Sequence, residues 1–190
     1  MSETSSSEGA LVEQAMDVVD YWLMAGPQRW FRKDAAFDAD FRERFLAAHE
    51  AAAAGKLSGL AATARGAMAL VLLLDQLPRN GFRGSPRMFA TDAQARAIAE
   101  AAIEAGFDRE VPEDLRNFFY LPFMHSESLA DQDKAVALCA QLGQPETDKY
   151  ARMHRDIIVR FGRFPHRNAV LGRQSTEEEL AFLASGGFGG

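Results

Sequence analysis

The sequence has little cysteine and no long apolar run, and both features narrow the class of protein. Its single cysteine, Cys139, cannot form an internal disulfide, which favours a reducing compartment. The longest nearly apolar run, residues 67–74, is far shorter than the roughly 20 residues that a membrane-crossing helix needs, and Asp75 closes it. The serine-rich start, residues 2–9, has neither the basic nor the apolar part of a secretory signal. We therefore expect a cytoplasmic protein without a membrane partner.

Several motifs of catalysis and cofactor binding are also missing. The sequence contains no glycine-rich phosphate loop, no dinucleotide-binding fingerprint and no serine on a Gly-x-Ser-x-Gly turn. Three histidines (His125, His154 and His166), taken with Glu127 and Asp75, lack the His-x-x-x-His or Glu-x-x-His spacing that places two metal ligands on one helical face. We therefore predict neither a cofactor nor a metal site.

The overall composition is typical of a globular protein, because apolar residues make up 47% and charged residues 25% of the 190 residues. This size predicts one domain over residues 10–185, a disordered tail over residues 1–9 and a flexible tail over residues 186–190. The charge is uneven. Residues 152–173 contain six arginines and one acid, a local charge of +5, which leaves −11 for the rest of a chain whose net charge is −6. So acidic a remainder disfavours a nucleic-acid partner.

Apolar spacing and helix-ending residues predict about eight helices and no strand. The expected helices span residues 11–24, 36–54, 60–77, 86–105, 112–121, 128–142, 146–161 and 176–184. Asp34 is expected to cap the second helix, while Ser128 and Thr176 each precede an acidic residue by three positions, as in a capping box. A strand over residues 68–74 is the competing interpretation, which the flanking alanines and the lack of alternation disfavour. The pattern indicates an all-α domain of antiparallel helical hairpins.

Three proline-centred junctions between the expected helices hold residues that a plain scaffold does not obviously need. In the first junction, residues 74–84, Asp75 follows an aliphatic run near the end of a helix. A buried carboxylate at that place is costly unless it is paired, and Arg79 and Arg83 are near enough in sequence to pair with it. A structural ion pair is the plainer interpretation, and a functional acid is the alternative.

The second junction, residues 122–127, places His125 at the start of an expected helix. The helix dipole there favours the neutral imidazole, which suits a general base or a ligand, and Glu127 is near enough to orient it. A packed or hydrogen-bonded histidine is the plainer interpretation of this position.

The third junction, residues 154–173, is the richest in arginine. The planar guanidinium suits carboxylate and phosphate groups, so an anion site is physically reasonable. In the alternative interpretation these arginines pair with Asp75, Glu127 and other acids and link the helices together. Because buried charges of opposite sign must be paired, we expect the three junctions to meet in space.

Two functions follow from these junctions. In the leading interpretation the protein is a binding module whose Arg/His-rich groove takes an acidic small molecule or peptide. In the alternative it is an enzyme in which His125 or His166 is the general base, Asp75 or Glu127 orients that base and the arginines stabilise an anion. The candidate ligand-binding residues are Arg79, Asn80, Arg83, His154, Arg163, Arg167, Asn168 and Arg173.

The longest motifs of the chain are Asp20-Tyr21-Trp22, Trp30-Phe31, Leu74-Asp75-Gln76-Leu77-Pro78-Arg79-Asn80, Pro122-Phe123-Met124-His125-Ser126-Glu127 and Phe161-Gly162-Arg163-Phe164-Pro165-His166-Arg167-Asn168. Over about residues 11–183 the chain resembles the bacterial domain-of-unknown-function family 924. The resemblance implies an all-helical fold similar to tetratricopeptide-repeat proteins, in which helical hairpins stack into a curved superhelix. It implies no established activity and no functional residue.

Overall fold

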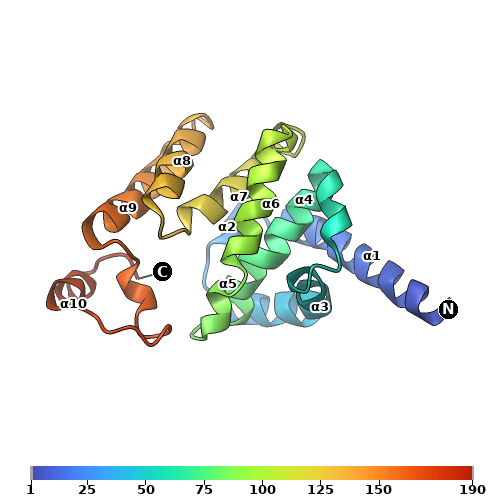
Figure 1. Ribbon diagram of the computed structural model, residues 1–190, viewed down its shortest axis with the longest axis horizontal. Helices are drawn as coiled ribbons and strands as arrows, with labels where there is room; N and C mark the ends of the chain where they lie inside the picture. Colours follow the sequence, from blue (N-terminus) through green and yellow to red (C-terminus); the bar gives the residue numbers. More distant parts are fainter. Residues whose placement is uncertain (1, 190) are drawn as a thin grey trace. The chain divides into compact units, whose positions relative to one another are not determined.

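The computed structural model describes the backbone of residues 2–189 and the side chains of residues 9–189. Within this range the chain is helical and has no strand, which confirms the all-α class and the helix predicted over residues 68–74 (Figure 1). The chain packs as two compact units, Met1–Arg83 with Arg87–Pro122, and Gly84–Pro86 with Phe123–Gly190. The single domain and the superhelical stacking stay predictions. None of the described helices has the length and apolar character that a membrane span requires.

The first unit contains six helices and most of a seventh. They are α1 (Ser2–Ala25), α2 (Pro27–Trp30), α3 (Ala35–Ala53), α4 (Ala64–Val71), α5 (Leu77–Gly81), α6 (Asp92–Glu104) and α7 (Glu113–Met124), with 3-10 turns at Ser58–Ala62 and Phe107–Arg109 and a π-helix at Leu72–Gln76. A further 3-10 turn, Pro86–Phe89, belongs to this unit from Arg87 onward. Helix α1 packs against α3 and α4, and α4 packs against α6.

Aromatic side chains fill the core of the first unit. The buried Trp22 ring of α1 lies 5.1 Å from Phe41 and 5.5 Å, edge-on, from Phe118. Its backbone oxygen accepts a hydrogen bond from the Trp30 indole at 2.6 Å. The chain reaches Trp30 through Gly26, whose φ of 72° lies in the left-handed region that favours glycine. The sequence predicted only an aromatic junction here, whereas the structure forms the short helix α2.

The second unit contains α8 (Leu129–Ala140), α9 (Pro145–Phe161), a 3-10 turn (Pro165–Arg167) and α10 (Glu177–Ala184). Helices α8 and α9 lie side by side (Figure 1). Cys139 is fully buried in α8, and burial raises the pKa of its thiol to about 12, so this residue is part of the core and not a nucleophile. A second apolar cluster joins Ile157 and Ile158 of α9 to Phe164.

The helix caps predicted at Asp34 and Thr176 are confirmed. The Asp34 carboxylate accepts the backbone N–H groups of residues 36 and 37. Thr176 and Glu179 form the full reciprocal capping box of α10. Both caps satisfy amide groups that have no partner inside the helix.

The predicted capping box of α8 is wrong, because Ser128 makes no side-chain bond to the helix. Ser126, two residues earlier, takes its place. The Ser126 hydroxyl donates to the Asp131 carboxylate at 2.6 Å and accepts the N–H of Ser128 at 3.2 Å. The buried Ser126 therefore holds the acid that Ser128 was expected to meet.

Several helix ends also differ from the predicted ones. Helix α1 begins at Ser2 instead of residue 11, α6 begins at Asp92 instead of residue 86, and α7 continues through Pro122 to Met124. Met1 and Gly190 lie outside the described residues, and the flexibility of residues 1–9 and 186–190 stays a prediction.

Candidate functional site

In the first junction, charged side chains bind one another. Asp75 is 0% exposed, and its carboxylate lies 3.0 Å from the Arg79 guanidinium and accepts a 2.7 Å hydrogen bond from the Gln76 amide. Arg79 donates two further bonds to Asp92, at 2.8 and 3.0 Å. The predicted pairing of Asp75 with Arg79 is therefore confirmed, and it agrees with the interpretation of this junction as a structural ion pair.

The other two candidates of the first junction bind a different acid. Asn80 donates to the buried Asp38 of α3 at 2.9 Å, and Arg83 donates to the same carboxylate at 2.6 and 3.3 Å. Arg83 therefore pairs with Asp38, where the sequence indicated Asp75. Asp38 lies more than 40 residues away in the sequence, and no local pattern indicated it.

The π-helix that carries Asp75 depends on donors from other elements. The N–H of Leu77 binds the carbonyl of Leu72, five residues earlier, so the Leu73 carbonyl loses its usual helical donor. The Leu74 carbonyl loses its donor too, because residue 78 is proline and has no N–H. His49 of α3 lies 2.9 Å from the Leu73 oxygen, and Thr91 donates to the Leu74 oxygen at 2.5 Å.

The second and third junctions meet inside the second unit. The Glu127 carboxylate accepts two bonds from Arg173, at 2.7 and 3.0 Å, and the backbone N–H of Phe164 at 2.8 Å. Arg167 donates to the carbonyl oxygen of His125 at 2.9 Å. The predicted meeting is confirmed for these two junctions, and the approach of the first junction to them stays a prediction.

Glu127 is bound by the Arg173 side chain and by the backbone of Phe164. Burial alone raises its pKa, but the Arg173 guanidinium and the Phe164 amide outweigh that effect and hold the pKa below its ordinary value. Both carboxylate oxygens accept bonds from these two residues, so Glu127 acts as an anchor between the junctions. Its predicted role in orienting His125 stays a prediction.

A second carboxylate of this unit is shared by two candidate residues. Arg163 donates to Glu179 at 2.6 and 2.8 Å, and the Asn168 amide donates to the same carboxylate at 3.2 Å. Glu179 is 2% exposed, and the bond from Arg163 is the main cause that lowers its pKa to about 2. Arg163 and Arg173 are therefore paired with carboxylates, which agrees with the alternative in which arginines link the helices.

Phe164 is the centre of the remaining candidates, and we call Phe164, His154, His166 and Arg167 the Phe164 cluster. The Phe164 ring is 0% exposed. The Arg167 guanidinium carbon lies 4.6 Å from the ring centre, and both imidazole rings lie 5.6 Å from it. Burial, with the Arg167 charge as the next cause, lowers the pKa of His166 to about 4, so this imidazole is neutral at pH 7.

Some buried polar atoms at this end of the second unit have no hydrogen-bond partner within the described chain. Among them are His166 Nδ1, Asn168 Oδ1 and Arg173 Nε. Because nearly all buried polar atoms in native proteins are hydrogen-bonded, each such atom requires an explanation. Among the described residues, no group of three or more histidine, cysteine or acidic side chains is placed to hold a metal ion.

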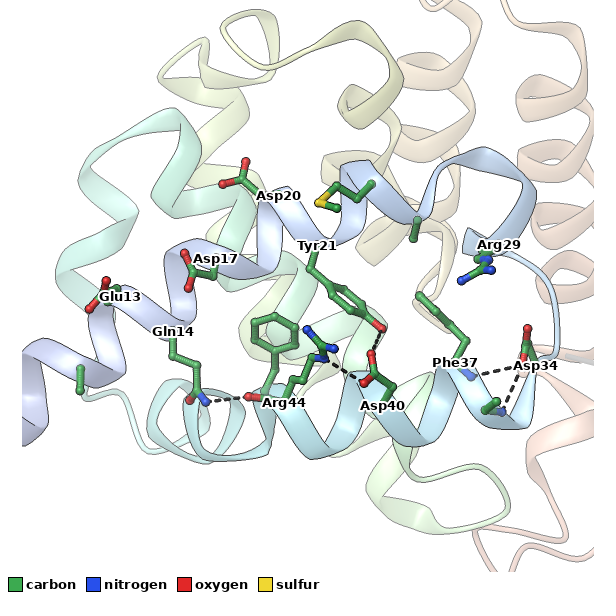
Figure 2. Close-up of a pocket in the computed structure, with 15 residues that line it drawn as sticks. Glu13, Gln14, Asp17, Asp20, Tyr21, Arg29, Asp34, Phe37, Asp40 and Arg44 are labelled. Carbon is green, nitrogen blue, oxygen red and sulfur yellow. Dashed lines mark hydrogen bonds and ion pairs between the residues drawn. The ribbon is translucent and has the colours of Figure 1, made fainter.

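A separate groove of about 990 Å³ lies between α1 and α3 in the first unit (Figure 2). The Tyr21 hydroxyl donates to Asp40 at 2.9 Å, and Arg44 donates to the same carboxylate at 2.8 Å. The other charged lining residues are Glu13, Asp17, Asp20, Arg29 and Asp34. This groove is mainly acidic, and the sequence patterns did not indicate it.

Comparisons with known proteins agree with the sequence motifs. Residues 18–187 match a family model described as bacterial protein of unknown function, DUF924. A solved structure of a protein of unknown function from Agrobacterium tumefaciens is 53% identical, with a TM-score of 0.87, over 90% of this chain and 97% of that one. No curated protein matches the chain. The chain therefore belongs to the DUF924 family of bacterial proteins, for which no function is established.

Proposed function

We propose that this protein is a binding module whose Phe164 cluster, with the polar atoms beside it, binds an acidic small molecule or peptide. One observation carries the proposal: His166, Asn168 and Arg173 each hold a buried polar atom without a hydrogen-bond partner in the described chain. Burying such an atom unpaired costs about 1–3 kcal/mol. A ligand that completes these hydrogen bonds recovers that free energy.

The chemistry of these atoms defines the ligand. Arg173 Nε can only donate, Asn168 Oδ1 can only accept, and the neutral His166 ring has one donor and one acceptor nitrogen. A carboxylate beside an amide N–H or a hydroxyl offers both kinds of partner. Acidic peptides and hydroxy acids have this combination, so they are the ligands that we propose.

The arginines have different parts in this proposal. Arg163 and Arg173 are already paired with Glu179 and Glu127, so they contribute shape and directed donors more than net positive charge. Arg167 is buried over the Phe164 ring and donates to the His125 carbonyl. Its guanidinium therefore places a positive charge beside His166, and we assign part of the electrostatic attraction of an anion to it.

The experiment measures stabilisation of the folded protein by anions. Binding to the folded state alone adds about 2.7 kcal/mol when the ligand is at 100 times its dissociation constant. Succinate, malate or phosphate should therefore raise the melting temperature above that of a chloride control at equal ionic strength. Sulfate is left out, because it stabilises proteins by exclusion.

Matched variants decide whether that stabilisation comes from the proposed site. The increment should disappear in Arg167→Gln and His166→Ala, and it should persist in Arg152→Gln, which removes an exposed arginine of α9. Arg163→Gln should lower the melting temperature itself but keep the anion increment. Equal increments in all variants would show that these residues are only structural.

The family resemblance and the single cysteine support two further parts of the proposal, the stacking of the helices and the location in the cell. A tetratricopeptide-repeat-like stacking of the helices would suit a binding module. A single cysteine, buried in α8, favours a reducing cytoplasm.

A further inference from the structure

The last residues of the described chain place an aromatic ring against the proposed site. The Phe188 ring lies 4.5 Å from His154 at an interplanar angle of 62°, and 5.2 Å from His166 at 83°. Both are edge-to-face geometries, which aromatic rings prefer. Since both histidines also contact Phe164, the three rings of His154, Phe164 and His166, which we call the ring subsite, hold Phe188 as a fourth ring.

The backbone that carries Phe188 is built for close approach. Gly186 has a φ of 82°, and the Gly187 N–H donates to the Phe182 carbonyl at 3.0 Å. A Cβ on Gly187 would lie 2.6 Å from both the ring and the carbonyl oxygen of Phe182, so only glycine fits there. The segment after α10 therefore turns back at one defined place and presents Phe188 to the ring subsite.

Apart from the Phe188 ring, residues 186–189 offer no side chain that could hold this segment in place. Glycines occupy residues 186, 187 and 189, and glycine loses more conformational freedom on ordering than any other residue. The Phe188 side chain itself is only partly buried, packed against the cluster of Ile157, Ile158 and Phe164. A single partly buried ring on a glycine-rich segment is an occupant that another aromatic ring can replace.

We infer that the ring subsite binds the aromatic ring of the acidic ligand, and that Phe188 occupies this subsite until the ligand displaces it. The inference rests on the proposed function and makes its ligand class narrower: an aromatic acid, or a peptide with an aromatic side chain beside an acidic group. The neutral His166 ring can face an aromatic edge without a charge to desolvate. Arg167, next to it in sequence and stacked over Phe164, is the partner of the carboxylate.

The test compares three probes of similar size. Phenylacetate has a ring and a charge, cyclohexylacetate has the charge without aromaticity, and phenylacetamide has the ring without the charge. Dissociation constants are measured by calorimetry for the wild type, Phe188→Ala and Phe188→Leu. Leu180→Ala is the matched control, because Leu180 lies on α10 and is 55% exposed.

Removing the Phe188 ring should tighten binding of the ligand. The apparent dissociation constant equals the intrinsic one divided by the fraction of molecules whose ring subsite is open, and this fraction rises when Phe188 is absent. We expect Phe188→Ala to bind phenylacetate about tenfold or more tightly than the wild type, with Leu180→Ala unchanged and Phe188→Leu in between. Cyclohexylacetate and phenylacetamide should both bind Phe188→Ala less tightly than phenylacetate does. In the wild type, phenylacetate should move the ring-proton NMR signals of Phe188 toward free-phenylalanine values.

Three outcomes overturn the inference, and they differ from a failure of the proposed function. If all acids bind the wild type and Phe188→Ala alike and Phe188 signals stay in place, an acid site exists but the ring subsite does not. If phenylacetamide equals phenylacetate in Phe188→Ala, and Arg167→Gln changes neither, the substitution has only opened an apolar cavity. If no probe binds folded Phe188→Ala, the ring subsite is absent, and the anion-stabilisation experiment alone decides the proposed function.

Discussion

Both units of the molecule contain a buried carboxylate that binds one asparagine amide and one arginine guanidinium. These groups are Asp38 with Asn80 and Arg83 in the first unit, and Glu179 with Asn168 and Arg163 in the second. The sequences around the two asparagines are similar, Pro-Arg-Asn at residues 78–80 and Pro-His-Arg-Asn at residues 165–168. In both of these similar motifs, the asparagine amide therefore donates a hydrogen bond to a buried carboxylate.

The two arrangements differ in the residues between proline and asparagine. In the first unit, Arg79 binds the carboxylates of Asp75 and Asp92. In the second unit, the additional His166 has a buried nitrogen without a partner in the described chain, and Arg167 lies over an aromatic ring. The comparison teaches that ion pairing within the fold explains the first junction, whereas the third junction retains buried polar atoms that the described contacts do not explain.

The largest expected effect is on the first unit. Asp75→Ala leaves the partly buried Arg79 with one carboxylate in place of two and removes the acceptor of the buried Gln76 amide. We expect a loss of about 3 kcal/mol in the free energy of unfolding, measured by urea denaturation, because an ion pair is broken and a buried amide donor loses its acceptor. Asp75→Asn keeps the shape and serves as the control with a smaller loss. A change below about 1 kcal/mol in Asp75→Ala would contradict a structural first junction.

The next effect is a pH dependence that belongs to the second unit. The pKa of Glu179 is about 2 in the folded protein and ordinarily 4.5, so its stabilisation is complete above about pH 4.5 and is lost as the pH falls toward 2. Between pH 6 and pH 3 this residue should account for about 2 kcal/mol of the lost unfolding free energy. Glu179→Gln should lack that portion of the loss, while Glu178→Gln, an exposed neighbour, should retain it. Identical pH profiles for the wild type and the two variants would show that Glu179 does not cause this pH dependence of the unfolding free energy.

The smallest effects concern the helix caps of both units. Asp34→Ala in the first unit and Thr176→Ala in the second should each lower the free energy of unfolding by about 1 kcal/mol, because each deletes a real cap. Ser128→Ala should change it by less than about 0.5 kcal/mol, because Ser128 makes no side-chain cap bond. A loss at Ser128 as large as that at Thr176 would show that α8 is capped as its sequence indicated.

Part of the candidate site could be predicted from neighbouring residues. Asp75 and Arg79 are four residues apart, so one helical turn brings them together, and the cost of a buried carboxylate required such a partner. Proline at residue 78 also carried a signal for the π-helix, since it left the Leu74 carbonyl without a donor. The donor itself, Thr91, lies 17 residues away, and nothing near it in sequence indicates that contact.

Other parts of the site could not be found in this way. The contact of Phe188 with His154 and His166 joins a segment expected to be only a flexible tail to residues of two different elements. Its only sequence signal was an aromatic residue among glycines, a pattern that tails and turns share. The exchange of Ser128 for Ser126 at α8 was missed because both serines precede the same acid, and only the geometry of the turn distinguishes them.

The amino-acid sequence by itself determined the all-α class, the two caps at Asp34 and Thr176 and the burial of Cys139, because helix periodicity and capping depend on residues within one or two turns. Only the tertiary structure decided which acid each arginine meets. The bonds of Arg83 to Asp38 and of Arg173 to Glu127 join residues 45 and 46 positions apart. An arginine pairs equally well with any carboxylate that the fold brings within reach, so its partner is chosen by helix packing and not by the local sequence.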